Sequence, residues 1–212
     1  MSADPGTTDG QRSRVFLRPI ATPLPMGFLA LMVATSTLAA VQLGWLEPAQ
    51  GRDAAVAAVL LTAPVQIIAA VFGFLARDPV AGTGMAILSG TWAVIGAVTL
   101  VTPPGHTSPG LGVVLLGSAA ALLVPTVSGT GKAVAAAVMG CTALRFAVTG
   151  VLELTGDAVW KTVAGAVGLA LGALAFYAAL AFELEGVKGR TVLPTGRPSP
   201  VTGEEAGVRR PL

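Results

Sequence analysis

Charged side chains are scarce in this chain, and their scarcity disfavours most classes of protein. Of its 212 residues only 11% are Asp, Glu, Lys or Arg, whereas 53% are hydrophobic and the mean hydropathy is +0.77. A water-soluble domain carries about 25% charged residues. The charges are too few to cover a surface that faces water, which argues against a soluble enzyme, a nucleic-acid binder and a disordered chain. At about 20 residues per span, the length instead predicts roughly six transmembrane helices.

Reactive side chains are equally few. The single cysteine, Cys141, excludes an intramolecular disulfide. The single histidine, His106, has no cluster of Cys or carboxylate residues beside it, so we predict no metal site. Residues 128–132 resemble a phosphate-binding loop only in part, because Thr126 and Ala133 stand where such a loop has Gly and Ser or Thr. No other catalytic motif is present, and we predict a protein that is not an enzyme and uses no cofactor.

Asparagine is absent altogether, which excludes N-glycosylation sequons. Ala, Gly and Val predominate, as is typical of a GC-rich genome. This composition predicts a bacterial inner membrane, that is, a plasma membrane. The net charge of +2 is too small to indicate a nucleic-acid partner.

Six apolar segments lie between a polar N-terminal stretch and a polar C-terminal one. They cover residues 24–46, 55–76, 80–101, 110–127, 132–154 and 158–183. Each is long enough to cross a hydrocarbon core of about 30 Å, and the short breaks between them are rich in turn residues. We therefore predict an all-α integral membrane protein with six transmembrane helices in a compact bundle. Its expected parts are a disordered cytoplasmic arm (1–19), a transmembrane domain (20–187) and a cytoplasmic tail (188–212).

The distribution of Lys and Arg predicts the orientation of the bundle. With both termini cytoplasmic, ten of the 13 basic residues lie on the cytoplasmic side: Arg12, Arg14, Arg18, Arg77, Lys132, Lys188, Arg190, Arg197, Arg209 and Arg210. Only Arg52 and Lys161 then lie outside, while Arg145 lies within a span. Ten against two agrees with the positive-inside rule, so we predict that both termini are cytoplasmic.

Arg145 is the charged residue that this pattern does not explain. It stands nine residues before Leu154, which is about 13 Å from the helix end at 1.5 Å per residue. A charge at this depth costs about 2.5–3.5 kcal/mol even on the lenient insertion scale. Two interpretations stay open. Arg145 is either a substrate-binding cation in a permeation path or one half of an ion pair with Glu153 or Glu183.

A proline and a glutamine interrupt the second segment. Pro64 removes a backbone hydrogen bond and leaves a carbonyl free one turn earlier, near Leu60. Irregular backbone at membrane depth is tolerated where it is buried in protein or lines a cavity. Gln66, two residues on, is therefore interpreted either as a substrate-binding group or as a hydrogen-bonding residue between helices.

The first segment opens with two prolines around one residue, which predicts a helix that begins at or just after Pro25. The free amides of a helix N-terminus form a ready anion site, so Thr22, Pro25 and Gly27 are candidate substrate-binding residues. In the last segment Gly165, Gly168 and Gly172 form a stripe with Ala164 at helical spacing. Small residues let helices approach closely in lipid, and the stripe predicts tight packing within a bundle or an oligomer.

Two stretches carry a resemblance to a known family. Residues 22–28, Thr-Pro-Leu-Pro-Met-Gly-Phe, are similar to the Asn-Pro-x-Pro-Leu-Gly-Leu signature of the acetate uptake transporter family, the succinate–acetate permeases. Residues 189–196, Gly-Arg-Thr-Val-Leu-Pro-Thr-Gly, resemble the terminal Gly-Arg-Thr-x-Leu-Pro segment of that family. Between them the same residue types recur at Gln66, Ile67, Trp92, Gly165, Gly168, Gly172 and Tyr177. The resemblance spans about residues 20–196.

The resemblance implies uptake of acetate and similar short carboxylates, with succinate as a further substrate. It also implies hexamers with a pore in each protomer, and a proton-coupled or a channel-like mechanism. By offset from the two motifs, the constriction of such a pore falls near Leu31, Leu88 and Thr142. The chain departs from the family at Thr22, which replaces the signature Asn, and at Arg145, where relatives carry an apolar residue.

We therefore predict a plasma-membrane transporter or anion channel for small monocarboxylates. The expected substrate-binding residues are Thr22, Pro25, Gly27, Gln66, Thr142 and Arg145, and the expected pore constriction is Leu31 and Leu88. Expected partners are carboxylate anions, protons, the lipid bilayer and further copies of the chain. Two alternatives remain: a non-transporting membrane interaction protein, and a pore for another small solute such as ammonium.

Overall fold

The protein is an all-α bundle of membrane-length helices. The computed structural model describes residues 20–196, so the predicted arm (1–19) and residues 197–212 of the predicted tail lie outside the described residues. Six helices of this range are long and apolar enough to cross a membrane, which confirms the predicted six-helix membrane fold. The six spans are α1 (Leu24–Gln42), a broken second span (Pro48–Leu75), α4 (Pro79–Val101), α5 (Pro109–Ser128), α6 (Ala133–Thr155) and α7 (Ala158–Lys188). The broken span consists of η1 (Pro48–Gln50), α2 (Gly51–Ala57), η2 (Ala58–Thr62) and α3 (Ala63–Leu75), and η3 (Thr130–Lys132) precedes α6.

Most helix boundaries fall at the turn residues that the sequence marks. Asp78, Ser108 and Asp157 cap α4, α5 and α7, each accepting a hydrogen bond from a free backbone amide of the first turn. Three boundaries differ from the prediction. The second span begins at Pro48, seven residues before the predicted start at residue 55, because η1 and α2 precede the apolar run. The first helix stops at Gln42, four residues early, just before Gly44 turns the chain with a φ of +74°. The last helix continues to Lys188, five residues beyond the predicted end. Glu183 and Glu185 favour helix formation, and they lie in the last two turns, where the helix becomes polar.

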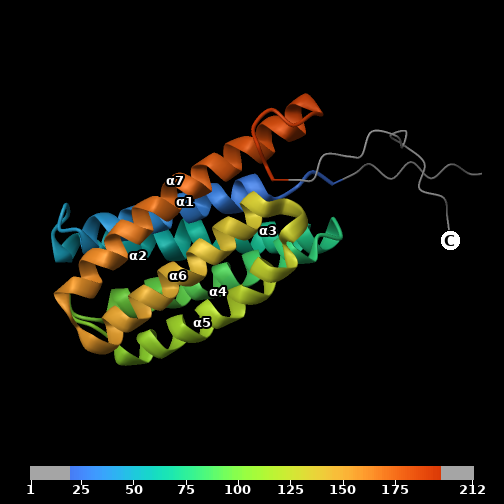
Figure 1. Ribbon diagram of the computed structural model, residues 1–212. Coiled ribbons are helices and arrows are strands. Elements are labelled where there is room, and N and C mark those ends of the chain that lie inside the picture. Colours follow the sequence, from blue (N-terminus) through green and yellow to red (C-terminus); the bar gives the residue numbers. More distant parts are fainter. Residues whose placement is uncertain (1–19, 197–212) are drawn as a thin grey trace, which may run out of the picture.

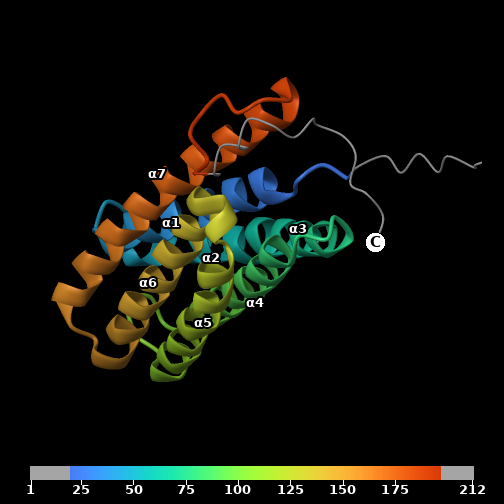
Figure 2. The same cartoon turned by 45° about the vertical axis from the view of Figure 1, so that its right-hand side comes forward.

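The helices form a layered bundle with two distinct ends (Figure 1). Helix α1 packs along α7, α5 along α6, and α3 along α4, and the second view shows the same pairs side by side (Figure 2). One end holds the α1–η1, α4–α5 and α6–α7 connections, and we call it the vestibule end. The opposite end holds the start of α1, the α3–α4 and α5–α6 connections and the end of α7, and we call it the terminal end. This arrangement follows from short connections between antiparallel neighbours.

The glycine stripe of α7 packs against α1. A Cβ atom at Gly165 would lie 2.6 Å from a carbon of Leu43, and one at Gly172 would lie 2.5 Å from the Ser36 hydroxyl. Thr35 donates a hydrogen bond of 3.3 Å to the Gly168 carbonyl between these two contacts. The stripe therefore brings the α1 and α7 backbones together within one chain.

The second span is irregular where Pro64 interrupts its hydrogen bonds. Residues Ala58–Thr62 form a π-helical turn, and the amide of Ala63 bonds to the Ala58 carbonyl five residues earlier. The irregular turn lies one turn before the proline, at the place where the sequence predicts a free carbonyl. Thr62 donates a hydrogen bond of 3.1 Å to the Ala30 carbonyl, which joins this turn to the middle of α1.

The C-terminal motif folds back onto the bundle. Tyr177 donates a hydrogen bond of 2.8 Å to the Pro194 carbonyl, and the Val134 amide donates one of 3.2 Å to the Thr195 carbonyl. The second bond satisfies a free amide in the first turn of α6. Gly196 has a φ of +69° and would place a Cβ only 2.5 Å from that of Ala133. Residues 189–196 thus tie the end of α7 to the start of α6.

The outer faces of the helices are apolar. Large hydrophobic side chains such as Val101 and Leu60 are 82% and 73% exposed. A soluble protein does not leave so much apolar surface in contact with water. Together with the six spans, this surface shows a multi-pass membrane protein.

Candidate functional site

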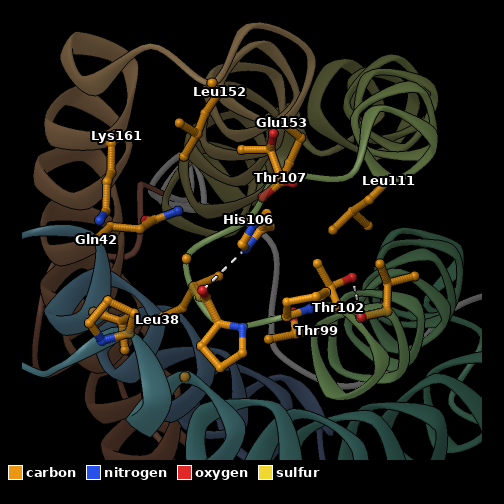
Figure 3. Close-up of a pocket in the computed structure, with 18 of the residues that line it drawn as sticks. Leu38, Gln42, Thr99, Thr102, His106, Thr107, Leu111, Leu152, Glu153 and Lys161 are labelled. Atoms are coloured by element: carbon orange, nitrogen blue, oxygen red, sulfur yellow. Dashed lines mark hydrogen bonds between the residues drawn. The ribbon is translucent and has the colours of Figure 1, made fainter.

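A cavity of about 170 Å³ opens at the vestibule end (Figure 3). It is enclosed by the ends of α1, α4 and α6, the starts of α2, α5 and α7, and the α4–α5 loop. Three of its lining residues carry or can carry a positive charge: Arg52, His106 and Lys161. Glu153 is the acidic residue among those that line it, and Gln42 contributes a buried amide. We call this cavity the vestibule.

Glu153 is held on the α5 side of the vestibule. Its carboxylate accepts a hydrogen bond of 2.7 Å from the Ser108 backbone amide, at the cap of α5. The bond joins the end of α6 to the start of α5 and leaves Glu153 half-buried. Its position explains why Glu153 does not pair with Arg145, although both lie on α6.

Arg145 is buried in the bundle, with 1% of its surface exposed. One guanidinium nitrogen donates to the Ala164 carbonyl of α7 and, at 3.1 Å, to the Thr149 hydroxyl. The other donates a hydrogen bond of 2.6 Å to the side-chain oxygen of Gln42, at the end of α1. These contacts satisfy the guanidinium with neutral oxygens from three helices.

Neither carboxylate proposed as a partner of Arg145 forms an ion pair with it in residues 20–196. Glu183 lies on α7, which meets Arg145 at Ala164 and beside Gly168. Nineteen residues separate Glu183 from Ala164, which is about 28 Å along a helix. The ion-pair interpretation is therefore wrong for the described part of the chain. Arg145 does not line the vestibule itself and reaches it only through Gln42.

A smaller space of about 10 Å³ lies next to the vestibule, inside the bundle. It shares Leu38 and Thr99 with the vestibule and extends to Ala34 and Trp92. Trp92 is 1% exposed, and its ring packs edge-on against Phe146 with 5.8 Å between the centroids. Its indole N–H has no hydrogen-bond partner among the described residues. Trp92 thus forms an aromatic wall beneath the vestibule.

The predicted constriction residues lie deeper, near the middle of the helices. Leu31 and Leu88 have no exposed surface and belong to the same hydrophobic core, and Thr142 is equally buried. Thr142 donates its hydroxyl proton to the Val138 carbonyl of its own helix at 2.7 Å. The three residues lie seven to nine positions from the terminal ends of their helices, which is about 10–14 Å. The bundle is closed at this level.

The terminal end carries a second hollow, of about 410 Å³, and the motif that opens α1 lines it. Thr22 and Pro23 contribute to its wall, together with an ion pair between Lys132 and Asp78. The Thr22 hydroxyl is buried and has no hydrogen-bond partner among residues 20–196. Pro25, one turn further in, is fully enclosed by the bundle.

Gly27 and Gln66 meet inside the bundle. The side-chain amide of Gln66 donates a hydrogen bond of 3.3 Å to the Gly27 carbonyl, and Gln66 is 0% exposed. Its side-chain oxygen has no partner in the described part of the chain. The contact is a hydrogen bond between helices, which is one of the two interpretations of Gln66 from the sequence. The candidate residues are thus divided: Thr22 lines the terminal hollow, Gly27 and Gln66 meet inside the bundle, and Arg145 reaches the vestibule through Gln42.

Two residues of this path were not among the predicted site residues. Gln42 ends α1 and joins Arg145 to the vestibule, and Trp92, a core residue, lines the small space next to the vestibule. Both had a signal in the sequence. Gln42 is a polar residue inside an apolar segment, and Trp92 is one of three tryptophans in the chain.

Comparisons with known proteins agree with the fold and with the motifs. No protein-family model and no curated protein matches the chain. Among solved structures, the bacterial acetate channel SatP is 26% identical, with a TM-score of 0.72, and the match covers 83% of this chain and 99% of that one. The chain therefore has the fold of that acetate channel, and its resemblance to the acetate uptake transporter family, predicted from the motifs at its two ends, is confirmed.

Proposed function

We propose that the chain transports small monocarboxylates, acetate foremost and succinate as a larger substrate, through a pore in each protomer. The observation that carries this proposal is the course of α1. From one end to the other, the chain at α1 lines the terminal hollow with Thr22, crosses the closed core at Leu31, and lines the inner space and the vestibule with Leu38 and Gln42. The α1 segment thus lines a hollow at each end of the bundle and passes through the closed core between them. A gated path requires this arrangement. The likeness to an acetate channel supports the choice of substrate.

The charges along the path suit an anion. A short carboxylic acid with a pKa near 4 is mostly ionised at neutral pH, and burying an unpaired carboxylate in an apolar medium is very costly. Arg52 and Lys161 at the vestibule and Arg145 behind it lower that cost by Coulomb attraction. The buried leucines in the middle would then remove water from the ion. Both a channel mechanism and coupling to a proton are compatible with this path, and an uncoupler of the proton gradient distinguishes them.

The proposed orientation places the terminal end in the bacterial cytoplasm and the vestibule outside. The asymmetry of Lys and Arg supports it. A reporter enzyme that is active only in the cytoplasm, fused after Leu212, is expected to be active. An inactive fusion with intact expression would contradict the orientation.

The proposed oligomer is a hexamer, as the resemblance implies. The outer face between α4 and α5 supports a helix-packing contact there, because it carries a shallow groove of about 460 Å³ lined by small residues, among them Gly90 and Gly117. A Cβ at either glycine would meet nothing within 4 Å. Native mass spectrometry from detergent is expected to give six copies, and a monomer would contradict this part of the proposal.

Uptake into liposomes tests the function directly. Purified protein is reconstituted, and entry of radiolabelled acetate is compared with that of chloride and methylammonium, with protein-free liposomes as the background. We expect acetate uptake well above background and above chloride. Selective methylammonium entry would favour the ammonium pore, and no entry of any solute would favour the non-transporting interaction protein.

A further inference from the structure

The end of α1 places a buried amide against the vestibule. Gln42 is the last residue of α1, is only 9% exposed, and lines the cavity. Its side chain reaches inward beside Lys161, with the amide nitrogen directed towards the side of His106 (Figure 3). It is therefore the most enclosed polar side chain of the vestibule wall.

Arg145 determines which atom of this amide faces the cavity. A guanidinium has donors only, so the Gln42 atom that meets it must be the oxygen. The bond of 2.6 Å from Arg145 holds that oxygen towards the protein interior. The NH₂ group of Gln42 then points away from Arg145, and it has no acceptor among residues 20–196. This NH₂ group is not among the fully buried atoms, so a ligand in the cavity can reach it and supply an acceptor.

The surroundings of this donor favour an acceptor with a negative charge. Arg52 and Lys161 line the same cavity, and the Arg145 guanidinium lies directly behind the amide. Glu153 opposes them, but one of its oxygens is already bonded to the Ser108 amide. The cavity of about 170 Å³ far exceeds the roughly 10–15 Å³ that one water needs, so a carboxylate of four heavy atoms fits with part of its hydration shell.

We propose that the Gln42 side-chain amide binds the carboxylate of the transported anion at the base of the vestibule, and that Arg145 is the positioning residue that turns this amide towards it. The proposal rests on the proposed transport function and adds a site to it. Gly168 is part of the arrangement, because a Cβ there would lie 2.9 Å from the guanidinium carbon of Arg145. The ligand class is a short monocarboxylate, whose two oxygens accept from the amide and from the nearby cations.

The test measures the KM and the maximal rate of acetate uptake in proteoliposomes. Gln42→Met keeps the length of the side chain and removes the donor. It is expected to raise the KM at least about tenfold, the lower limit for the loss of a hydrogen bond to a charged group. Gln42→Glu replaces the donor by a negative charge and is expected to raise it further. Gln50→Glu is the matched control, since it makes the same change on an exposed residue at the same end of the bundle, outside the cavity lining. It is expected to leave the KM unchanged.

The role of Arg145 is tested by a double-mutant cycle. Arg145→Met alone is expected to raise the KM. Added to Gln42→Met it is expected to raise the KM by a clearly smaller factor, because the donor that Arg145 positions is already gone and only its Coulomb attraction for the anion is lost. A purely structural Arg145 would lower the maximal rate equally in both backgrounds. Independent, multiplying effects on the KM would overturn the positioning role.

The outcomes separate this inference from the proposed function. If the wild type does not carry acetate above protein-free liposomes, both fail together. If the wild type carries acetate and the Gln42 variants keep its KM within about twofold, the inference alone is overturned. Gln42→Asn withdraws the amide by one methylene and serves if the other variants do not fold. It is also expected to raise the KM for acetate, and a KM within about twofold of the wild type would overturn the inference.

Discussion

Gly168→Ala is the substitution whose effect on stability the structure defines best. A Cβ at this position would lie 2.9 Å from the Cβ of Ala39 and 2.9 Å from Cζ of Arg145. Ordinary van der Waals contact begins at 3.4 Å, so the new methyl group requires about 0.5 Å of separation. The Cβ of Ala39 is fixed to its backbone, and the guanidinium is held by bonds to three helices. Neither neighbour moves without loss elsewhere.

The magnitude follows from two opposing terms. Overpacking a close-packed site costs about 1–3 kcal/mol. Replacing Gly by Ala inside a helix returns up to about 1 kcal/mol. We therefore expect a net loss of up to about 2 kcal/mol in the free energy of unfolding. The hydrogen bond from Thr35 to the Gly168 carbonyl, at 3.3 Å, would also lengthen as α1 and α7 separate.

Gly186→Ala provides the matched control on the same helix. A Cβ at Gly186 would meet nothing within 4 Å, so only the propensity term applies and the variant is expected to gain stability. The assay is thermal unfolding of the purified protein in detergent, followed by intrinsic tryptophan fluorescence. At about 2–4 °C per kcal/mol for a chain of this size, Gly168→Ala should melt up to about 8 °C below the wild type and Gly186→Ala above it. A Gly168→Ala protein that melts at or above the temperature of Gly186→Ala would refute the argument from close approach.

Three further predictions concern other contacts. Thr35→Val removes the hydrogen bond to Gly168 and is expected to cost about 0.5–1.5 kcal/mol in the same melting assay, with acetate KM unchanged. Lys132→Met removes the partly exposed ion pair with Asp78; we expect a loss of about 1 kcal/mol that shrinks when NaCl is raised from 0.05 to 1 M, and a salt-independent loss would contradict an ionic origin. Trp92→Leu opens the wall beneath the vestibule, so uptake of butyrate relative to acetate is expected to rise in proteoliposomes, at a stability cost of about 1–3 kcal/mol. An unchanged butyrate-to-acetate ratio would remove Trp92 from the path.

The membrane helices could be predicted because each one is determined by residues within its own segment. A spanning segment must satisfy its own backbone and must be apolar over its whole length, so each one is visible in its own stretch of sequence. Pro64 likewise predicted the irregular turn that lies within six residues before it. The turn and capping residues around Asp78 and Asp157 also act within a few positions of themselves.

The candidate site was predictable only in part. Arg145 stood out by the cost of its burial, but its partners did not, since Gln42 lies 103 residues away along the chain. The sequence offered two carboxylates as partners, Glu153 on the same helix and Glu183 on the next one, and neither meets Arg145 in the folded bundle. Glu153 is instead bonded to Ser108, 45 residues away, and Glu183 lies far along α7.

What the sequence determined by itself was the class of protein, the number of spans, their main breaks and the likeness to a transporter family, because each depends on composition or on short motifs. What only the tertiary structure decided was which helices are neighbours, and therefore that the α7 glycines meet α1, that Arg145 bonds to Gln42, and that α1 follows both hollows. The physical reason is that the lipid stabilises every apolar helix to a similar extent, so hydrophobicity does not select which helices become neighbours. Neighbours are selected by close packing and by hydrogen bonds between distant residues, and these exist only once the bundle has formed.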